Sequence, residues 1–327
     1  MGERLRTEPE EVVLRPKREN TLSRSRFREA VFRALAFALR ALRGTRAGRV
    51  GPLKALWNRL FEFSRPKGVV LRQIQGSRMY VDADDRGLGQ ALLLGVFEPF
   101  QTVLFTDSLR ESATVVDVGA NIGYYSLLAA RRVGDRGRVF AMEPNPETYS
   151  MLLQNIKIND YRNVIPLQIC VSNCRGKAQF HLDRAIPGES ALSLCGGQED
   201  PDAIAVETST LDEILGDDGV DVLKIDVEGA EGLVLLGGQS LLRRTQPTIF
   251  MEFVPRRLAK MGTRPGDVLA FLKGCGYSFL VINEKIGRLD AVSEAELVGG
   301  AGSSAENIAC VPAAKGWRPD NWQSKLS

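Results

Sequence analysis

The segment 115–125 constrains the fold of this chain more than any other part of the sequence. It begins with valines on both sides of Asp117, and β-branched residues without polar alternation predict a buried strand. The residues that then let the backbone turn and approach a ligand closely are Gly119, Ala120, Asn121 and Gly123. A helical pattern follows the turn. Because a helix N-terminus presents unpaired N–H groups, we expect this turn to bind a ligand.

The spacing within the turn separates two classes of ligand. Dinucleotide-binding proteins use G-x-G-x-x-G and place a pyrophosphate on the helix N-terminus. This chain has D-x-G-x-N-x-G instead, with Asp117 close to the end of the strand. A carboxylate there repels a pyrophosphate but pairs with a cationic amino group. S-adenosylmethionine has an ammonium, a carboxylate and a sulfonium and no phosphate, so the charge pattern favours it over NAD as the cofactor.

A second acid closes the next predicted strand. Glu143 lies 24 residues after Gly119, and an acid at this place hydrogen-bonds ribose hydroxyls in adenosine-binding proteins. We therefore expect Glu143, together with Asn145 beside it, to bind the cofactor. Either acid alone is as easily read as a solvated carboxylate at a strand end, but the pair around a glycine turn favours an adenosine-containing ligand.

Apolar strands alternate with helices along most of the chain. Predicted strands cover 114–118, 138–142, 164–171, 222–226, 248–253 and 277–282. Predicted helices cover 123–133, 146–159, 230–237 and 265–274, with a hairpin near 177–182. Upstream, we expect a short strand at 79–81 and one or two helices within 88–104. This alternation predicts an α/β fold with a Rossmann-like, doubly wound, mostly parallel sheet.

Charge is distributed unevenly along the chain. The net charge is only +3, yet residues 1–72 hold 18 Lys+Arg and 7 Asp+Glu, a net of +11, against −8 for the remainder. The small overall charge gives little support to nucleic-acid binding. We expect 1–22 to be disordered, 23–72 to form a basic, amphipathic helical extension, 73–312 to form the α/β domain and 313–327 to be a loose tail.

The helix expected at 24–43 allows two interpretations. Its apolar face consists of Phe27, Val31, Ala34, Ala38 and Leu42. A polar face carries Glu29, Arg33, Arg40 and Arg43. Such a helix can make a peripheral contact with an anionic membrane surface. It can equally pack on its own domain and keep its arginines in water.

The cysteine and histidine content indicates which cellular compartment and which metal sites to expect. Five cysteines without a C-x-x-C pair, and a single histidine, make a Cys/His zinc site improbable, and we expect no metal. The charge-free apolar run 34–39 is too short for a secretory signal or a membrane span. We therefore expect a cytoplasmic protein, with peripheral membrane contact as the alternative.

The segment 220–231 carries a second motif. Lys224 and Asp226 have the same parity on the predicted strand, so their side chains point to one face. Asp226 lies at the carboxyl end of that strand, where open α/β sheets bind ligands. Glu228 and Glu231 follow three residues apart, and they either line the site or interact favourably with the dipole of the next helix.

Taken together, the segments 117–123 and 224–231 resemble the FkbM family of methyltransferases. Shorter matching pieces are Glu98-Pro99, Glu143-Pro144, Thr210-Leu211-Asp212-Glu213 and Met251-Glu252-Phe253. The resemblance covers about residues 76–285. It implies a Rossmann-like methyltransferase fold and methyl transfer from S-adenosylmethionine, commonly to a hydroxyl oxygen of a sugar or a natural product.

An alcohol acceptor is a weak nucleophile and needs a base or a metal to remove its proton. The candidates for this catalytic role are Asp226, Glu228 and His181. Asp226 ranks first because its strand end faces the methyl group in this fold, and Lys224 either orients it or is structural. His181 is the only histidine, and an isolated histidine is more often structural.

Three functions are consistent with these patterns. We expect O-methylation of a sugar, glycosylated or natural-product acceptor. Methylation of an exocyclic amine is disfavoured because segment 226–229 reads D-V-E-G rather than an Asn/Asp-Pro-Pro-aromatic turn. The alternatives are a non-catalytic methyltransferase-like module docked to a membrane or partner, and an NAD-dependent oxidoreductase. The oligomeric state is not specified by the sequence.

Overall fold

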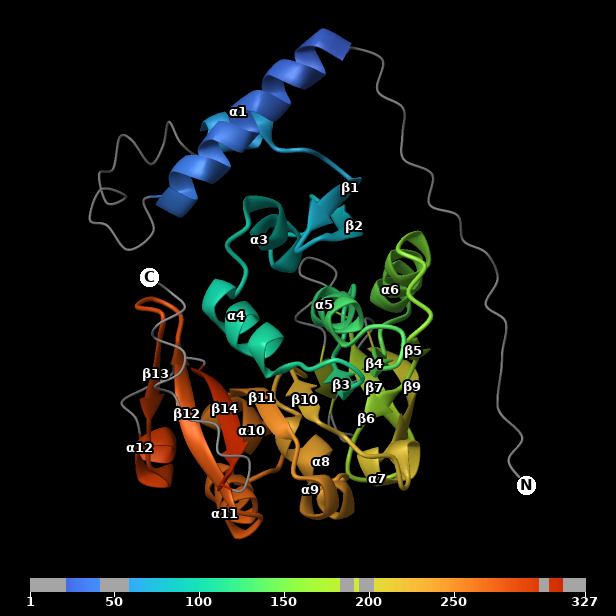
Figure 1. Ribbon diagram of the computed structural model, residues 1–327, viewed down its shortest axis with the longest axis vertical. Helices are drawn as coiled ribbons and strands as arrows, with labels where there is room; N and C mark the ends of the chain where they lie inside the picture. Colours follow the sequence, from blue (N-terminus) through green and yellow to red (C-terminus); the bar gives the residue numbers. More distant parts are fainter. Residues whose placement is uncertain (1–21, 42–58, 183–190, 194–202, 300–305, 314–327) are drawn as a thin grey trace.

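The computed structural model describes residues 22–41, 59–182, 191–193, 203–299 and 306–313. The predicted disorder of 1–22 and the predicted loose tail therefore lie almost wholly outside the described residues. The centre of the molecule is an eight-stranded sheet in the order β13-β12-β14-β11-β10-β3-β4-β5, and Figure 1 shows it below the first helix.

Five neighbouring strands of this sheet are parallel. They are β3 (Thr114–Val118), β4 (Arg138–Met142), β5 (Val164–Leu167), β10 (Val222–Ile225) and β11 (Thr248–Phe253). Three antiparallel strands extend the sheet beyond β11, namely β12 (Tyr277–Asn283), β13 (Arg288–Ala291) and β14 (Glu306–Pro312). The predicted α/β class with a mostly parallel sheet is thereby confirmed.

Helices cover both faces of the sheet and create two hydrophobic cores. On one face lie α4 (Pro99–Ser108), α5 (Tyr124–Val133) and α6 (Pro146–Ile158). On the other lie α7 (Leu211–Leu215), α8 (Glu231–Leu236), α9 (Gln239–Thr245), α10 (Pro255–Lys260), α11 (Pro265–Gly274) and α12 (Glu294–Gly299). Val115 belongs to the first core and Val116 to the second, as the two-residue period of a strand requires. Burial on both faces explains why these strands show no polar alternation.

A smaller sheet departs from the sequence-based expectations. It has the order β6-β9-β7-β8, with β6 (Cys170–Val171), β7 (Gly176–His181), β8 (Ala191–Ser193) and β9 (Ala203–Ser209). The strand predicted at 164–171 is in fact split between the two sheets. The hairpin predicted near 177–182 is confirmed in part: β7 is its first strand and pairs antiparallel with the next strand, β8, but β7 also pairs with β9 on its other edge.

The N-terminal region consists of α1 (Leu22–Ala41), a helical turn at 59–64, and the antiparallel pair β1 (Val69–Ile74) and β2 (Ser77–Asp82). Figure 1 shows α1 above β1 and α3 (Leu88–Leu94). The predicted apolar face of α1 is wrong as a packing face. Phe27 and Ala34 are exposed, and the buried residues are Phe32 and Ala36 on the other side of the helix.

Within the described residues, no single helix is long and apolar enough to cross a bilayer. The bent pair α3 and α4, whose axes meet at 85°, passes the same test of length and composition.

Candidate active site

A cavity of about 290 Å³ opens at the carboxyl ends of β3, β4 and β10. This is the place where the strand order reverses, because β3 has β4 on one side and β10 on the other. Open α/β sheets bind ligands at such a point. One part of the wall follows β3, β4 and the small sheet: Asp117, Gly119, Ala120, Asn121, Met142, Glu143, Ile169, Cys170 and Phe180. The other part includes Leu88, Phe97, Tyr124, Tyr125, Lys224, Asp226 and Glu228.

The glycine turn has the left-handed backbone that its sequence predicts. The φ angles are +82° at Gly119, +49° at Asn121 and +95° at Gly123. A Cβ atom on Gly119 would lie only 1.9 Å from the carbonyl oxygen of Asp226, so any other residue would displace the end of β10. The N–H groups of Gly119 and Ala120 both donate to the Met142 carbonyl at 2.9 Å, which fixes the turn to β4.

Asp117 is almost fully buried, yet it lines the cavity. Its Oδ2 atom accepts a hydrogen bond from Ser126 Oγ at 2.5 Å. Burial raises the pKa of Asp117 to about 6, although the bond from Ser126 and the charge of Lys224 act in the opposite direction. A buried carboxylate at a cavity wall is stabilised by a ligand that brings a positive charge.

Glu143 is buried at the end of β4 and is held by three donors. The Asn121 N–H donates at 2.8 Å, the Asn145 N–H at 2.9 Å and Thr148 Oγ1 at 2.9 Å. Burial raises the pKa of Glu143 to about 6, against the effect of these hydrogen bonds. The carboxylate is therefore rigidly oriented, with one edge at the cavity.

Two predicted cofactor residues lie behind the cavity wall rather than on it. Asn145 caps α6, since its Oδ1 accepts from the Glu147 N–H at 3.0 Å, and its backbone N–H orients Glu143. Gly123 is the N-cap of α5, and a Cβ atom there would lie 2.7 Å from Leu152 Cδ1. Neither residue lines the cavity.

The chemistry of this part of the cavity fits S-adenosylmethionine. The charged side chains beside the glycine turn are carboxylates, Asp117 and Glu143, suited to an ammonium and to ribose hydroxyls. Ile169, Cys170 and Phe180 form an apolar wall of the size that a purine requires. Lys224 is the cation among the lining residues, and it is bonded to Asp226, so nothing on this wall matches a pyrophosphate.

On the other side of the cavity, Lys224 and Asp226 meet as their common parity predicts. Lys224 Nζ lies 2.9 Å from Asp226 Oδ2 and 5.0 Å from the centre of the Tyr125 ring. Burial disfavours the charged amine, but the carboxylates of Asp226 and Glu98 outweigh this effect and raise the pKa of Lys224. Lys224 is thus a permanent cation beneath a carboxylate that faces the cavity.

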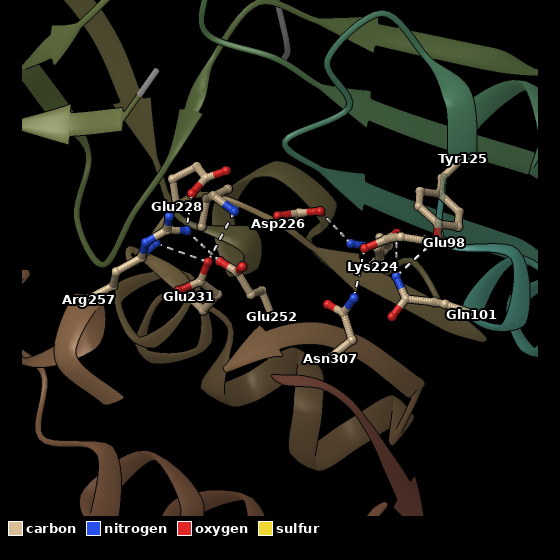
Figure 2. A network of polar contacts seen from close by, with 12 residues as sticks. Glu98, Gln101, Tyr125, Lys224, Asp226, Glu228, Glu231, Glu252, Arg257 and Asn307 are labelled. Atoms are coloured by element: carbon tan, nitrogen blue, oxygen red, sulfur yellow. Dashed lines mark hydrogen bonds and ion pairs between the residues drawn. The ribbon is translucent and has the colours of Figure 1, made fainter. Parts of the chain in front are cut away.

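Glu98 is the functional residue that sequence reasoning missed, although the Glu98-Pro99 pair is part of the family resemblance. Its carboxylate accepts hydrogen bonds from Tyr125 Oη at 2.6 Å, Gln101 Nε2 at 2.8 Å and Asn307 Nδ2 at 2.7 Å. Its backbone is left-handed, with a φ of +34°. Figure 2 shows Glu98 on the far side of Lys224 from Asp226, so the lysine lies between two carboxylates.

A second charged group lies beyond Asp226. Arg257 Nη1 pairs with Glu252 at 3.0 Å and with Glu228, which lines the cavity and has a φ of +54°. Figure 2 shows Arg257 between these carboxylates. A left-handed backbone at a non-glycine residue costs roughly 1–3 kcal/mol, and such strain concentrates at functional sites. Glu228 therefore combines a strained backbone with a place on the cavity wall, which makes it a candidate site residue.

Glu231 has a structural role instead. Its Oε1 accepts from the N–H groups of Gly229 at 3.1 Å and Val227 at 3.2 Å, and so closes the turn before α8. Burial raises its pKa to about 7. The sequence allowed Glu231 either to line the site or to act at the start of the next helix, and the structure supports the second role.

His181, the third catalytic candidate, is exposed at the end of β7 and does not line the cavity. Its neighbour Phe180 does, because successive side chains on a strand point to opposite faces. The structure brings Asp226 and Glu228 to the cavity and leaves His181 outside it. In the described residues, no group of three or more His, Cys, Asp or Glu side chains is arranged to hold a metal ion.

Several curated relatives of this chain are methyltransferases. Methyltransferase sdnD of Sordaria araneosa is 30% identical, with the match covering 41% of this chain and 66% of the relative. Hexuronic acid methyltransferase AglP of Haloferax volcanii is 31% identical, covering 43% and 56%. 2-O-methyltransferase NoeI of Sinorhizobium fredii is 25% identical, covering 46% and 66%. The chain spans somewhat more than half the length of these relatives.

The family comparison agrees with the geometry of the cavity. The methyltransferase FkbM domain matches residues 117–279, a range that begins at the buried aspartate of the glycine turn and ends in β12. It includes Glu143, Lys224 and Asp226. Through residues 117–279, the chain belongs to the FkbM family of S-adenosylmethionine-dependent methyltransferases.

Proposed function

We propose that this protein transfers the methyl group of S-adenosylmethionine to a hydroxyl oxygen of a sugar, glycosylated or natural-product acceptor. The observation that carries the proposal is the position of Asp226, a carboxylate held by the buried Lys224 at the boundary between the two parts of the cavity. The bound cofactor supplies an electrophilic methyl group on a sulfonium. The remaining tasks are orientation, exclusion of water and removal of one proton.

The wall beside the glycine turn is the cofactor side. Asp117 receives the ammonium, and Glu143 accepts from the ribose hydroxyls. Asn121 lines the same wall, and its N–H group holds Glu143 at 2.8 Å. The apolar side chains of Ile169 and Phe180 are suited to the adenine.

Asp226 acts on the acceptor. Because the ammonium of Lys224 lies 2.9 Å away, Asp226 presents its negative charge to the cavity and accepts a hydrogen bond from the acceptor hydroxyl. With S-adenosylmethionine bound, this hydrogen bond would orient an oxygen lone pair towards the methyl carbon. As the C–O bond formed and the S–C bond of the cofactor broke, Asp226 would take the hydroxyl proton and S-adenosylhomocysteine would leave. Glu98 keeps the lysine charged from its other side.

Glu228, Glu252 and Arg257 support a polyhydroxylated acceptor. Carboxylates accept from neighbouring hydroxyls, and a guanidinium donates to ring oxygens or to an acidic group. Two relatives agree with this chemistry by name, the hexuronic acid methyltransferase and the 2-O-methyltransferase. Phe97 and Leu88, on the same side, offer an apolar surface to a sugar face or an aglycone.

The first test is calorimetric binding of S-adenosylhomocysteine, with NAD as the comparison. We expect micromolar binding of the former, lost in Asp117→Ala and in Glu143→Ala, and retained in Asp160→Asn, a surface control. Tighter binding of NAD would indicate an oxidoreductase instead.

The second test measures transfer of a labelled methyl group to a panel of sugars, uronic acids, glycosides and hydroxylated natural products. We expect a product with one new methyl ether, formed by the native protein and not by Asp226→Asn. Binding of the cofactor without methyl transfer to any member of the panel would instead favour a non-catalytic, methyltransferase-like module.

A further inference from the structure

The outer face of α1, defined here as Phe27, Ala30, Ala34 and Phe37, is apolar and exposed at each of these four positions. These positions follow one another at intervals of three and four, so they form a single stripe on the helix. Phe27 is 65% exposed and Phe37 is 67% exposed, among the highest values for large apolar side chains in the described residues. An apolar stripe of this kind marks an interaction surface.

Packing on the opposite side fixes this face outward. Phe32 is buried against Phe61, with ring centres 5.8 Å apart. Arg28 donates to the Phe63 carbonyl at 2.8 Å and lies over the Phe63 ring at 5.6 Å. Glu29 pairs with Arg72 at 2.9 Å. These contacts hold α1 in one rotation about its axis, so the outer face cannot turn inward without breaking them.

The charge of the segment that contains α1 indicates which kind of partner the outer face binds. Residues 22–72 contain 13 Lys+Arg and 2 Asp+Glu, whereas residues 1–21 contain five of each. Arg33 lies beside the outer face, and Arg59 and Lys67 are also exposed. A second copy of the chain would bring the same positive charge and be repelled. An apolar stripe with basic flanks complements the surface of a bilayer that contains anionic lipids.

We propose that the outer face of α1 docks this protein on an anionic membrane surface, with Phe27 and Phe37 inserted at the level of the lipid headgroups. The site of chemistry is close to this surface. α1 packs on α3, and Leu88, the first residue of α3, lines the cavity. Docking would bring the acceptor side of the cavity near the membrane. This proposal stands on the extension alone and does not depend on methyl transfer.

The test is sedimentation of the full chain with vesicles of phosphatidylcholine, with and without phosphatidylserine. We expect binding to the anionic vesicles to exceed binding to the neutral ones about tenfold or more, and to weaken as salt is added. Phe27→Ser/Phe37→Ser should lower anionic-vesicle binding about tenfold or more. The matched control is Leu236→Ser/Val298→Ser, which should retain full binding. It changes two side chains that are 42% and 44% exposed on α8 and α12, helices that Figure 1 shows at the opposite end of the molecule from α1.

Circular dichroism and binding of S-adenosylhomocysteine verify that each variant is folded. Equal binding to neutral and anionic vesicles, no binding to either, or full retention in the Phe27/Phe37 variant would overturn the proposal. So would light scattering that shows a dimer dissociated by the same two substitutions, because a second copy would then cover the face. Displacement of the vesicles by an oligonucleotide at equal charge concentration would point to nucleic acid instead.

Discussion

Lys224 Nζ lies 2.9 Å from Asp226 Oδ2, and the lysine is 1% exposed while the aspartate reaches the cavity. A buried cation thus supports a carboxylate at the place where substrate binds. Replacement of Asp226 by Asn keeps the shape of the side chain and removes its charge. We expect kcat to fall about 10²–10⁴-fold, the usual contribution of a general base. Affinity for S-adenosylhomocysteine should change little, and an equal loss of both quantities would contradict the assignment.

Lys224 also contributes to the stability of the folded protein. Lys224→Met leaves Glu98 and Asp226 without their shared cation in a largely buried place. We expect the free energy of unfolding to fall by at least about 2 kcal/mol, since an uncompensated buried charge costs several kcal/mol and Asp226 is partly solvated. Urea denaturation measures the change. The surface pair Arg288–Asp290 provides the control, because Arg288→Met should cost less than about 1 kcal/mol.

Local patterns predicted the parallel strands well. The bounds of β3, β4 and β11 are those expected, because apolar runs between glycine turns and helices mark buried strands without help from distant residues. The meeting of Lys224 with Asp226 follows from strand parity in the same way. The Asp117 and Glu143 positions follow from the order of strand, turn and helix.

Long-range pairing explains what could not be predicted. Glu98 gains its role from Asn307, which is 209 residues away in sequence, and from Tyr125 on α5. Strand β7 pairs not only with the next strand, β8, but also with β9, which lies further along the chain. α1 carries apolar residues on two opposite sides, and its contacts with Phe61, Phe63 and Arg72 decide that Phe32 packs inward.

Cofactor affinity should depend on pH through Asp117. Its folded-state pKa of about 6 lies above the ordinary value, so the carboxyl is protonated below pH 6 and cannot pair with an ammonium. We expect the Kd for S-adenosylhomocysteine to be constant above about pH 7 and to rise up to about tenfold per pH unit below 6. In the ligand-free protein the sign is reversed: stability falls as pH rises from about 4 to 6, because the folded state holds the extra proton.

Calorimetry between pH 5 and 8 tests this dependence, with Asp117→Asn as the comparison. The variant should bind weakly and with a flatter profile. The Glu143 pKa is also about 6, so some dependence should persist in the variant and disappear in the double variant Asp117→Asn/Glu143→Gln. A wild-type profile that is flat from pH 5 to 8 would show that neither carboxyl titrates in this range in the ligand-free protein, and so would contradict their raised pKa values.

Gly119 and Gly134 form a matched pair for testing the glycine turn. Both have positive φ, +82° and +69°, but a Cβ atom on Gly119 would lie 1.9 Å from the Asp226 carbonyl oxygen, whereas a Cβ atom on Gly134 meets nothing within 4 Å. Gly134 has a ψ of −178°, a region essentially restricted to glycine, so Gly134→Ala should cost only the backbone strain, about 1–3 kcal/mol. Gly119→Ala should cost more and abolish cofactor binding, since it displaces the ends of β3 and β10. Similar losses in both variants would show that strain alone, without the close approach, explains the glycine.

His181 provides the clearest contrast between an exposed and a lining residue on one strand. The imidazole lies outside the cavity, so His181→Ala should leave kcat/KM within about threefold of the native value, far from the 10²-fold or greater effect of losing a general base. Phe180→Ala removes an apolar wall and should weaken S-adenosylhomocysteine binding about tenfold or more. A pH-rate profile of the His181 variant completes the test. If the native profile has a limb near neutrality that vanishes in His181→Ala, the histidine is the base and Asp226 only orients the acceptor.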